Sequence, residues 1–223
     1  MKSKENNRKA ELVFILDRSG SMSGLENDTV GGYNSMMEKQ RESGMDITVT
    51  TVLFDDRYEL LHDRVKLDEL KPMTNEDYFV RGSTALIDAI GKTVKKIERA
   101  QEHTAAAHRA GKVIFVITTD GYENASCEFR AEDVKRMVER KREADGWEFI
   151  FLGANIDAVE TAKHYGFAES RAAKFSADSR GIEINNRVVG EAVACMMSCE
   201  YSLSDEEMDG YMAPIREYRE STE

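Results

Sequence analysis

Five oxygen-bearing side chains stand in three short segments that are far apart in the sequence. The first segment, LVFILDRSGSMSG, holds Asp17, Ser19 and Ser21, the second, VRGSTALIDAI, holds Thr84, and the third, KVIFVITTDG, holds Asp120. Carboxylates and hydroxyls are the oxygen ligands that a hard cation such as Mg2+ prefers, usually together with water. Two carboxylates balance the charge of one divalent ion, while the hydroxyls add ligands without adding charge. The residue types therefore predict a site for Mg2+, or for Mn2+ or Ca2+.

The two acidic residues of this set each follow directly on an apolar run, which is where a buried parallel strand is expected to end. In open α/β sheets, ligands bind beyond the carboxyl ends of the strands. We therefore expect Asp17 and Asp120 to share one edge of a sheet. Thr84 stands in a Gly-Ser-Thr turn that opens an amphipathic helix, so its hydroxyl is expected either to bind the metal or to cap that helix.

The alternation of strand and helix patterns predicts one α/β domain. Strands are expected over 11–17, 45–56, 57–67, 112–121 and 147–155, with a possible edge strand over 171–179. Helices are expected over 24–44, 80–100, 156–167 and 181–202, and a loop followed by a helix over 123–146. This order is typical of a doubly wound, Rossmann-like, three-layer α/β/α fold with a mostly parallel sheet of about six strands. The tight turn at Asp55 and Asp56 predicts a hairpin, and hence one antiparallel edge strand. We interpret residues 1–9 as a polar lead-in, 10–205 as the domain and 206–223 as a polar C-terminal tail.

Composition and charge limit the classes of partner that the protein can bind. The chain has 223 residues, 41% of them hydrophobic and 33% charged, and a formal net charge of −11. This charge opposes binding to nucleic acid or to an anionic membrane, which both require clustered basic residues.

No apolar run approaches membrane-spanning length and the N-terminal segment lacks a signal-peptide pattern, so we expect a cytoplasmic protein. Cys127, Cys195 and Cys199 lack metal-binding spacing, which favours reduced thiols. Cys195 and Cys199, one helical turn apart, are expected to be buried small side chains.

In identity and order, the five oxygen-bearing residues resemble the metal-ion-dependent adhesion site (MIDAS) of von Willebrand factor A-type (vWA) domains, and the resemblance covers most of the chain. It implies a stand-alone intracellular vWA domain in which Ser19, Ser21 and Thr84 are direct metal ligands. Asp17 and Asp120 would act largely through water. It also implies a protein partner that supplies a Glu or Asp to the metal, in an adaptor or assembly role.

Two alternatives to a protein-binding module are open. An Asp at a strand end is also the nucleophile of phosphoaspartyl phosphatases, so a metal-dependent phosphohydrolase that uses Asp17 is the alternative function. That chemistry requires a second Asp two residues later, where this chain has Ser19. No phosphate-binding loop, dinucleotide fingerprint or hydrolase serine motif is present in the sequence, so we expect a protein that is not an enzyme. A purely structural metal is the other alternative.

Residues on either side of the five ligands are candidates for a partner surface. They come from the first and third segments: Arg18, Met22, Tyr122, Glu123 and Asn124. Ordinary solvated loops explain the same residues equally well. We interpret Asp55 and Asp56 as a hairpin turn and not as a second cation site.

Overall fold

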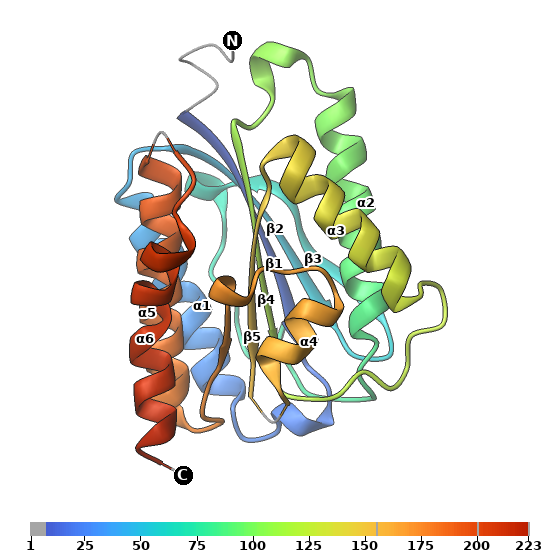
Figure 1. The fold of residues 1–223 in the computed structure, drawn as a ribbon, viewed down its shortest axis with the longest axis vertical. Helices are drawn as coiled ribbons and strands as arrows, with labels where there is room; N and C mark the ends of the chain where they lie inside the picture. Colours follow the sequence, from blue (N-terminus) through green and yellow to red (C-terminus); the bar gives the residue numbers. More distant parts are fainter. Residues whose placement is uncertain (1–7, 155, 200, 223) are drawn as a thin grey trace.

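The centre of the computed structural model, which describes residues 8–154, 156–199 and 201–222, is a six-stranded sheet (Figure 1). Its strand order is β3-β2-β1-β4-β5-β6, and β2 and β3 form the antiparallel pair while the other neighbours are parallel. The strands are β1 (Lys9–Asp17), β2 (Asp46–Phe54), β3 (Tyr58–Lys66), β4 (Lys112–Thr119), β5 (Glu148–Gly153) and β6 (Ala172–Lys174). The predicted fold class, including the single antiparallel edge strand, is confirmed.

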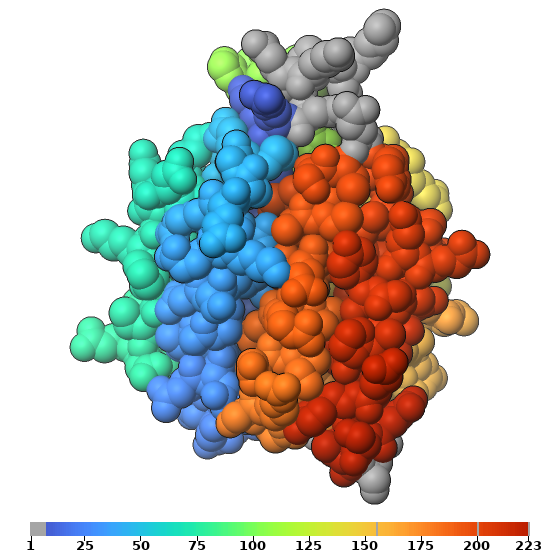
Figure 2. Space-filling model, turned by 90° about the vertical axis from the view of Figure 1, so that its left-hand side faces the viewer, coloured from blue at the N-terminus to red at the C-terminus, as the bar shows by residue number. Residues whose placement is uncertain are grey.

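Helices cover both faces of the sheet and complete the three layers (Figure 1). One layer contains α1 (Glu26–Arg41), α5 (Ser179–Ser198) and α6 (Asp205–Glu220), and the other contains α2 (Leu86–His103), α3 (Ala131–Asp145) and α4 (Ala158–His164). Figure 2 shows that α5 lies between α1 and α6. None of the helices in the described part of the chain is long and apolar enough to cross a membrane.

Strand β1 is buried on both of its faces, which explains the apolar run in its sequence. Its even-numbered side chains, from Ala10 to Leu16, join the core beneath α1, α5 and α6, whereas Val13 and Ile15 join the core beneath α2, α3 and α4. Successive side chains of a strand point to opposite faces. Because both faces are covered by helices, both sets must be apolar.

The contact between α1 and α5 depends on a glycine. A β-carbon at Gly32 would lie only 1.8 Å from Nδ2 of Asn186, so a larger residue would have to displace the Asn186 side chain. Further along the same contact, Nε2 of Gln40 donates a hydrogen bond of 2.9 Å to the carbonyl of Gly190. At the end of α5, Cys195 and Cys199 have their Sγ atoms 3.4 Å apart and are half-buried, although we expected them to be buried.

The interpretation of residues 206–223 as a polar tail is wrong for the described part of that segment, because α6 packs on the domain. Its inward positions Met208, Met212 and Ile215 are spaced at helical intervals and are each at most 2% exposed. The helix begins with a capping box, in which Ser204 and Glu207 each accept from the other's backbone N–H. The many charged residues of the segment conceal this narrow apolar stripe. Of the predicted lead-in, residues 1–7 lie outside the described residues.

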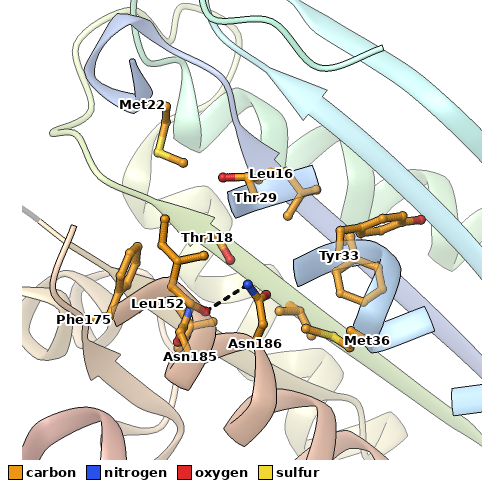
Figure 3. Close-up of a pocket in the computed structure, with 13 residues that line it drawn as sticks. Leu16, Met22, Thr29, Tyr33, Met36, Thr118, Leu152, Phe175, Asn185 and Asn186 are labelled. Carbon is orange, nitrogen blue, oxygen red and sulfur yellow. Dashed lines mark hydrogen bonds between the residues drawn. The ribbon is translucent and has the colours of Figure 1, made fainter. Parts of the chain in front are cut away.

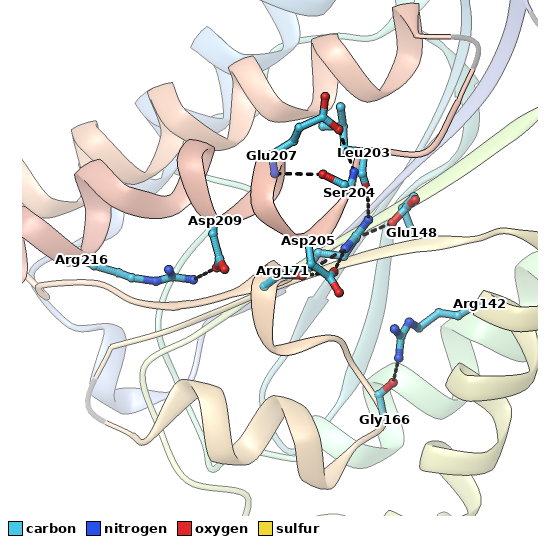
Figure 4. Close-up of polar contacts among 11 residues, drawn as sticks. Arg142, Glu148, Gly166, Arg171, Leu203, Ser204, Asp205, Glu207, Asp209 and Arg216 are labelled. Carbon is cyan, nitrogen blue, oxygen red and sulfur yellow. Dashed lines mark hydrogen bonds and ion pairs between the residues drawn. The ribbon is translucent and has the colours of Figure 1, made fainter.

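A buried arginine holds the start of α6 against the sheet (Figure 4). Arg171 is 7% exposed, and its Nε lies 2.6 Å from Oε2 of Glu148 while its Nη1 lies 2.9 Å from Oδ1 of Asp205. Its Nη2 also donates to the carbonyl of Leu203, at 2.7 Å. One side chain therefore joins the last two strands of the sheet to the last helix.

Candidate metal centre

The first acidic residue of the predicted site is buried between the two central strands. Asp17 is the last residue of β1 and is 1% exposed. Its Oδ1 accepts the N–H of Ser19 at 2.7 Å, and its Oδ2 accepts the hydroxyl of Thr119, the last residue of β4, at 2.5 Å. The hydroxyl of Tyr78 donates to the carbonyl of Asp17, at 2.5 Å. Asp17 therefore ties the β1 loop to the end of β4 and to a residue of the loop that carries Thr84.

The three predicted hydroxyl ligands converge around Gly121. A β-carbon at Gly121 would lie 3.1 Å from both Ser21 Oγ and Thr84 Oγ1, and 3.9 Å from Ser19 Oγ. The hydroxyls of Ser19 and Ser21 are 3.1 Å apart, and Ser21 also donates to Oδ1 of Asp120. The structure therefore brings together oxygen atoms from three loops, and the absence of a side chain at Gly121 leaves space among them.

The hydrogen bonds to the two acidic groups of the cluster come from neutral donors, which do not balance the negative charge. Asp120 is 1% exposed, and its Oδ2 has no hydrogen-bond partner among the described residues. Burial raises the pKa of Asp120, and burial raises the pKa of Asp17 to about 6, with a smaller contribution from the carboxylate of Asp120. A buried carboxylate oxygen without a partner is costly unless a cation lies beside it. The orphaned oxygen and the oxygen-only donor set both fit a hard divalent ion.

Nitrogen and sulfur ligands play no part in this cluster. Within residues 8–154, 156–199 and 201–222, no group of three or more His, Cys, Asp or Glu side chains is placed to hold a metal. The candidate centre combines two carboxylates with three hydroxyls, so its only acidic ligands are Asp17 and Asp120.

Thr84 is held by the loop that follows β4 and does not cap a helix. Helix α2 begins at Leu86, and its N-cap residue, Ala85, has no side-chain cap. The N–H of Thr84 donates to Oδ1 of Asn124 at 2.9 Å, and its carbonyl accepts the N–H of Asn124 at 3.0 Å. This pair of bonds leaves the Thr84 hydroxyl directed at the space beside Gly121.

Two carboxylates hold the loop over residues 121–129 in place. Glu123 accepts the N–H of Ile87, at 2.8 Å, and those of Ala125 and Ser126, at 2.9 and 2.7 Å. Asp88, on α2, accepts the N–H groups of residues 127–129 at 2.8–3.2 Å. Glu123 and Asn124 are thus loop supports, whereas Tyr122 between them and Gly121 is 67% exposed. The sequence signal for Asp88 is its position as an acidic residue in the first turn of a helix.

Arg18 and Met22 are internal supports, so the expectation that they line a partner surface is wrong. The Arg18 side chain is 0% exposed, its Nε donates to Oδ2 of Asp55 at 3.0 Å, and its Nη2 lies 2.6 Å from Oε2 of Glu59. Met22 is 1% exposed and lies over a cavity of about 30 Å³ between the sheet and helices α1 and α5 (Figure 3). The buried Oδ1 of Asn185 is at this cavity and has no hydrogen-bond partner in the described chain.

The turn after β2 is organised by hydrogen bonds and ion pairs to Asp55. Asp55 accepts the N–H of Arg57 through Oδ1 at 2.7 Å, which is the local bond expected of an Asp in a turn. Its Oδ2 accepts from both Arg18 and Arg81, at 3.0 and 2.7 Å. Although burial opposes ionisation, the hydrogen bonds from Arg81, Arg57 and Arg18 lower the pKa of Asp55. These contacts support the interpretation of a hairpin turn at this point.

Comparison of the sequence finds no matching family model and no significant match among curated proteins. Solved structures match the fold. Proximal thread matrix protein 1 from the mussel byssus has a TM-score of 0.56 and 14% identity, over 84% of this chain and 46% of that one. The von Willebrand factor type A protein from Catenulispora acidiphila has a TM-score of 0.57 and 13% identity, over 83% and 43%.

A third solved structure, the ArnB paralog VWA2 from Sulfolobus acidocaldarius, has a TM-score of 0.52 and 14% identity, over 82% of this chain and 44% of that one. The chain therefore spans less than half the length of these solved proteins. One structure of the mussel protein has a zinc-occupied MIDAS motif, at a TM-score of 0.56 and 13% identity. At these identities the comparison establishes the fold, and the chain has the α/β/α fold of a vWA domain.

Proposed function

We propose that this chain is a divalent-metal-dependent protein-interaction module with a MIDAS, and that it is not an enzyme. The convergence of the Ser19, Ser21 and Thr84 hydroxyls around Gly121 carries the proposal. These three residues would hold the ion directly, and Asp17 and Asp120 would act through water. A bound ion would supply an electrophilic centre for a carboxylate from outside the domain.

The partner that suits this site is a protein that presents a Glu or Asp. Three of the five ligands are neutral hydroxyls, so the ion keeps affinity for one more anionic oxygen. We propose Mg2+ as the resident ion, with Mn2+ or Ca2+ as substitutes, and the zinc-occupied MIDAS of the mussel protein supports divalent binding by this fold. An adaptor or assembly role in the cytoplasm is consistent with the net charge of −11, which disfavours nucleic acid and anionic membrane as partners.

The geometry of Asp17 argues against the phosphohydrolase alternative. Both of its carboxylate oxygens accept hydrogen bonds, from Ser19 and Thr119, and the residue is 1% exposed. A nucleophilic carboxylate must be accessible to the substrate that it attacks, and the Asp17 side chain is buried. Asp17 is placed to orient the loop, and Ser19 stands where a phosphatase of this type requires its second Asp.

Calorimetric titration of Mg2+ and Mn2+ tests the metal site. We expect one site in the wild type, its loss in Thr84→Ala and Ser21→Ala, and wild-type binding in Ser23→Ala, which removes an exposed hydroxyl from the same loop outside the cluster. Unchanged affinity in Thr84→Ala and Ser21→Ala would defeat the assignment.

Two further assays separate the alternatives. Turnover of an aryl phosphate that is abolished by Asp17→Asn would favour the phosphohydrolase. Proteins retained by the wild type in Mg2+ and released by chelator would support the interaction module, whereas metal binding without any metal-dependent partner would indicate a structural ion.

A further inference from the structure

Two loops beside the hydroxyl cluster each present an exposed aromatic side chain. Phe79 is 44% exposed and Tyr122 is 67% exposed. Only four large hydrophobic side chains in the described chain are at least 36% exposed, and the other two are Val159 and Tyr201. Half of the exposed large apolar groups are therefore on the loops that form the candidate metal centre. Exposed aromatic groups around a binding site are typical anchors for a protein partner.

Phe79 is held beside the first metal-binding loop by two arginines. The guanidinium carbons of Arg18 and Arg81 lie 5.3 and 5.2 Å from the centre of its ring. These are cation–π distances. The N–H of Arg81 also donates to the carbonyl of Arg18 at 2.9 Å, which joins the backbone of the Phe79 loop to the residue between Asp17 and Ser19. The ring is thus fixed in position and still open to a partner.

The two arginines do not add a free positive charge to this surface. Arg18 and Arg81 share Asp55, at 3.0 and 2.7 Å, and both approach Glu59, at 2.6 and 3.6 Å. Two cations thus face two carboxylates. Phe79 therefore offers a partner apolar contact and very little electrostatic attraction.

Tyr122 is adjacent to Gly121, the residue around which the hydroxyls converge. Its side chain has no hydrogen bond or ring contact with other described residues, while the backbone on its C-terminal side is held by Glu123. A tyrosine side chain has only two rotatable angles before its hydroxyl, so ordering it on binding costs little conformational entropy. Tyr122 is therefore suited to contact whatever ligand approaches the metal.

We propose that Phe79 and Tyr122 select the partner of the metal site, and that this partner presents a single acidic residue flanked by large apolar side chains. The proposal rests on the metal-dependent function above. The net charge of −11 repels a segment with many acidic residues. One carboxylate can meet the ion, and its neighbours then gain most by covering the two aromatic rings. An acidic residue in an apolar context is the segment that fits this surface.

A peptide display library tests the proposal on the full chain. Each member has one central Asp or Glu and three randomised residues on either side. The library is bound to the immobilised protein in Mg2+ and released with chelator. We expect aromatic and aliphatic residues to be enriched about twofold at the flanking positions of the released pool, relative to the input library, because aromatic and apolar anchors dominate binding energy in protein interfaces.

The variants Phe79→Leu and Tyr122→Ser are then measured against the strongest selected peptide. We expect each to weaken peptide binding about tenfold while Mn2+ affinity stays at the wild-type value, since neither residue belongs to the five ligands. Tyr201→Ser is the matched control, because Tyr201 is 60% exposed but lines a groove with Lys112, at the opposite end of β4 from Asp120. It should bind the peptide as the wild type does.

The outcomes separate this proposal from the one on which it rests. A chelator-released pool with flanks no more apolar than the input would overturn the aromatic selection and leave the metal-dependent function standing. Unchanged peptide affinity in both Phe79→Leu and Tyr122→Ser would do the same. A protein that binds no Mg2+ or Mn2+, or that retains no acidic peptide in a chelator-sensitive way, would overturn both proposals.

Discussion

Replacement of Asp17 by Asn should stabilise the metal-free protein and abolish metal binding. In the folded chain, burial raises the pKa of Asp17 from 3.8 to about 6. Near neutral pH the ionised carboxylate is therefore a liability for folding when no cation is present. An amide of almost the same shape keeps an acceptor for the N–H of Ser19, at 2.7 Å in the wild type, and carries no charge.

The pKa shift sets the size of the effect. One pKa unit corresponds to about 1.4 kcal/mol, so a rise of about two units destabilises the wild type by about 3 kcal/mol at pH 7. The new amide group cannot accept the Thr119 hydroxyl as Oδ2 does, which costs about 1 kcal/mol. Thr119 can redirect its hydroxyl to the carbonyl of Gly121, at 3.3 Å. We expect a net stabilisation of about 2 kcal/mol for Asp17→Asn in chelator at pH 7.

The pH dependence follows from the same shift. Because the folded-state pKa lies above the ordinary value, the folded chain binds the proton more tightly than the unfolded chain. The contribution of Asp17 to stability is therefore fully present below about pH 4, is lost as the pH rises toward 6, and is constant above that. The charge penalty on the wild type should fall to about half at pH 5 and to about 0.5 kcal/mol at pH 4. After subtraction of the cost of about 1 kcal/mol for the Thr119 hydrogen bond, the variant should be more stable by only about 0.5 kcal/mol at pH 5 and should have no advantage at pH 4.

Urea unfolding in chelator at pH 7, 5 and 4 measures these differences, and repetition in excess Mg2+ completes the test. Ligand binding to the folded state alone should stabilise the wild type and leave Asp17→Asn unchanged. A variant that is less stable than the wild type in chelator at pH 7, or equally stabilised by Mg2+, would refute the reasoning. Asp178→Asn, a cap substitution at the start of α5, is a control that should show no stabilisation.

Three further perturbations have definite expectations. Gly121→Ala places a methyl group 3.1 Å from the hydroxyls of Ser21 and Thr84, so Mn2+ affinity measured by calorimetry should fall at least about tenfold, with stability changed by less than about 1 kcal/mol. Arg171→Ala leaves the half-buried carboxylate of Glu148 and the carbonyl of Leu203 without this donor, and urea unfolding should show a loss of about 3 kcal/mol. A loss below about 1 kcal/mol would contradict the anchoring role. Met212→Ala, at a position that is 0% exposed, should cost about 2–4 kcal/mol, whereas a solvated tail would show no effect.

The elements that position the site can be predicted from the sequence, because each has a local pattern of apolar and turn residues. The run that ends at Asp17 can only be a strand covered on both faces, and the run that ends before Asp120 repeats that pattern. Parallel strands bring their carboxyl ends to one edge, so the approach of these two residues follows from topology. The position of Thr84 follows from the turn that precedes its helix.

The parts that escaped prediction depend on contacts that the local sequence does not specify. Arg18 looked like a surface residue because its partners, Asp55 and Glu59, lie about forty residues away. The burial of Met212 depends on the packing of α6 on α5, which the many charged residues of the segment 205–220 do not indicate. The role of Glu123 as a loop support depends on the position of α2, because the N–H of Ile87, at the start of that helix, donates to its carboxylate.

The hydrogen bonds that Asp88 and Glu123 accept from consecutive backbone N–H groups have a kinetic consequence. A loop whose amides are already saturated has little left to fold when another molecule arrives, so its recognition should be a rigid encounter governed by diffusion and orientation. Association rates should then vary little among partners, and selectivity should reside in how long each complex lasts.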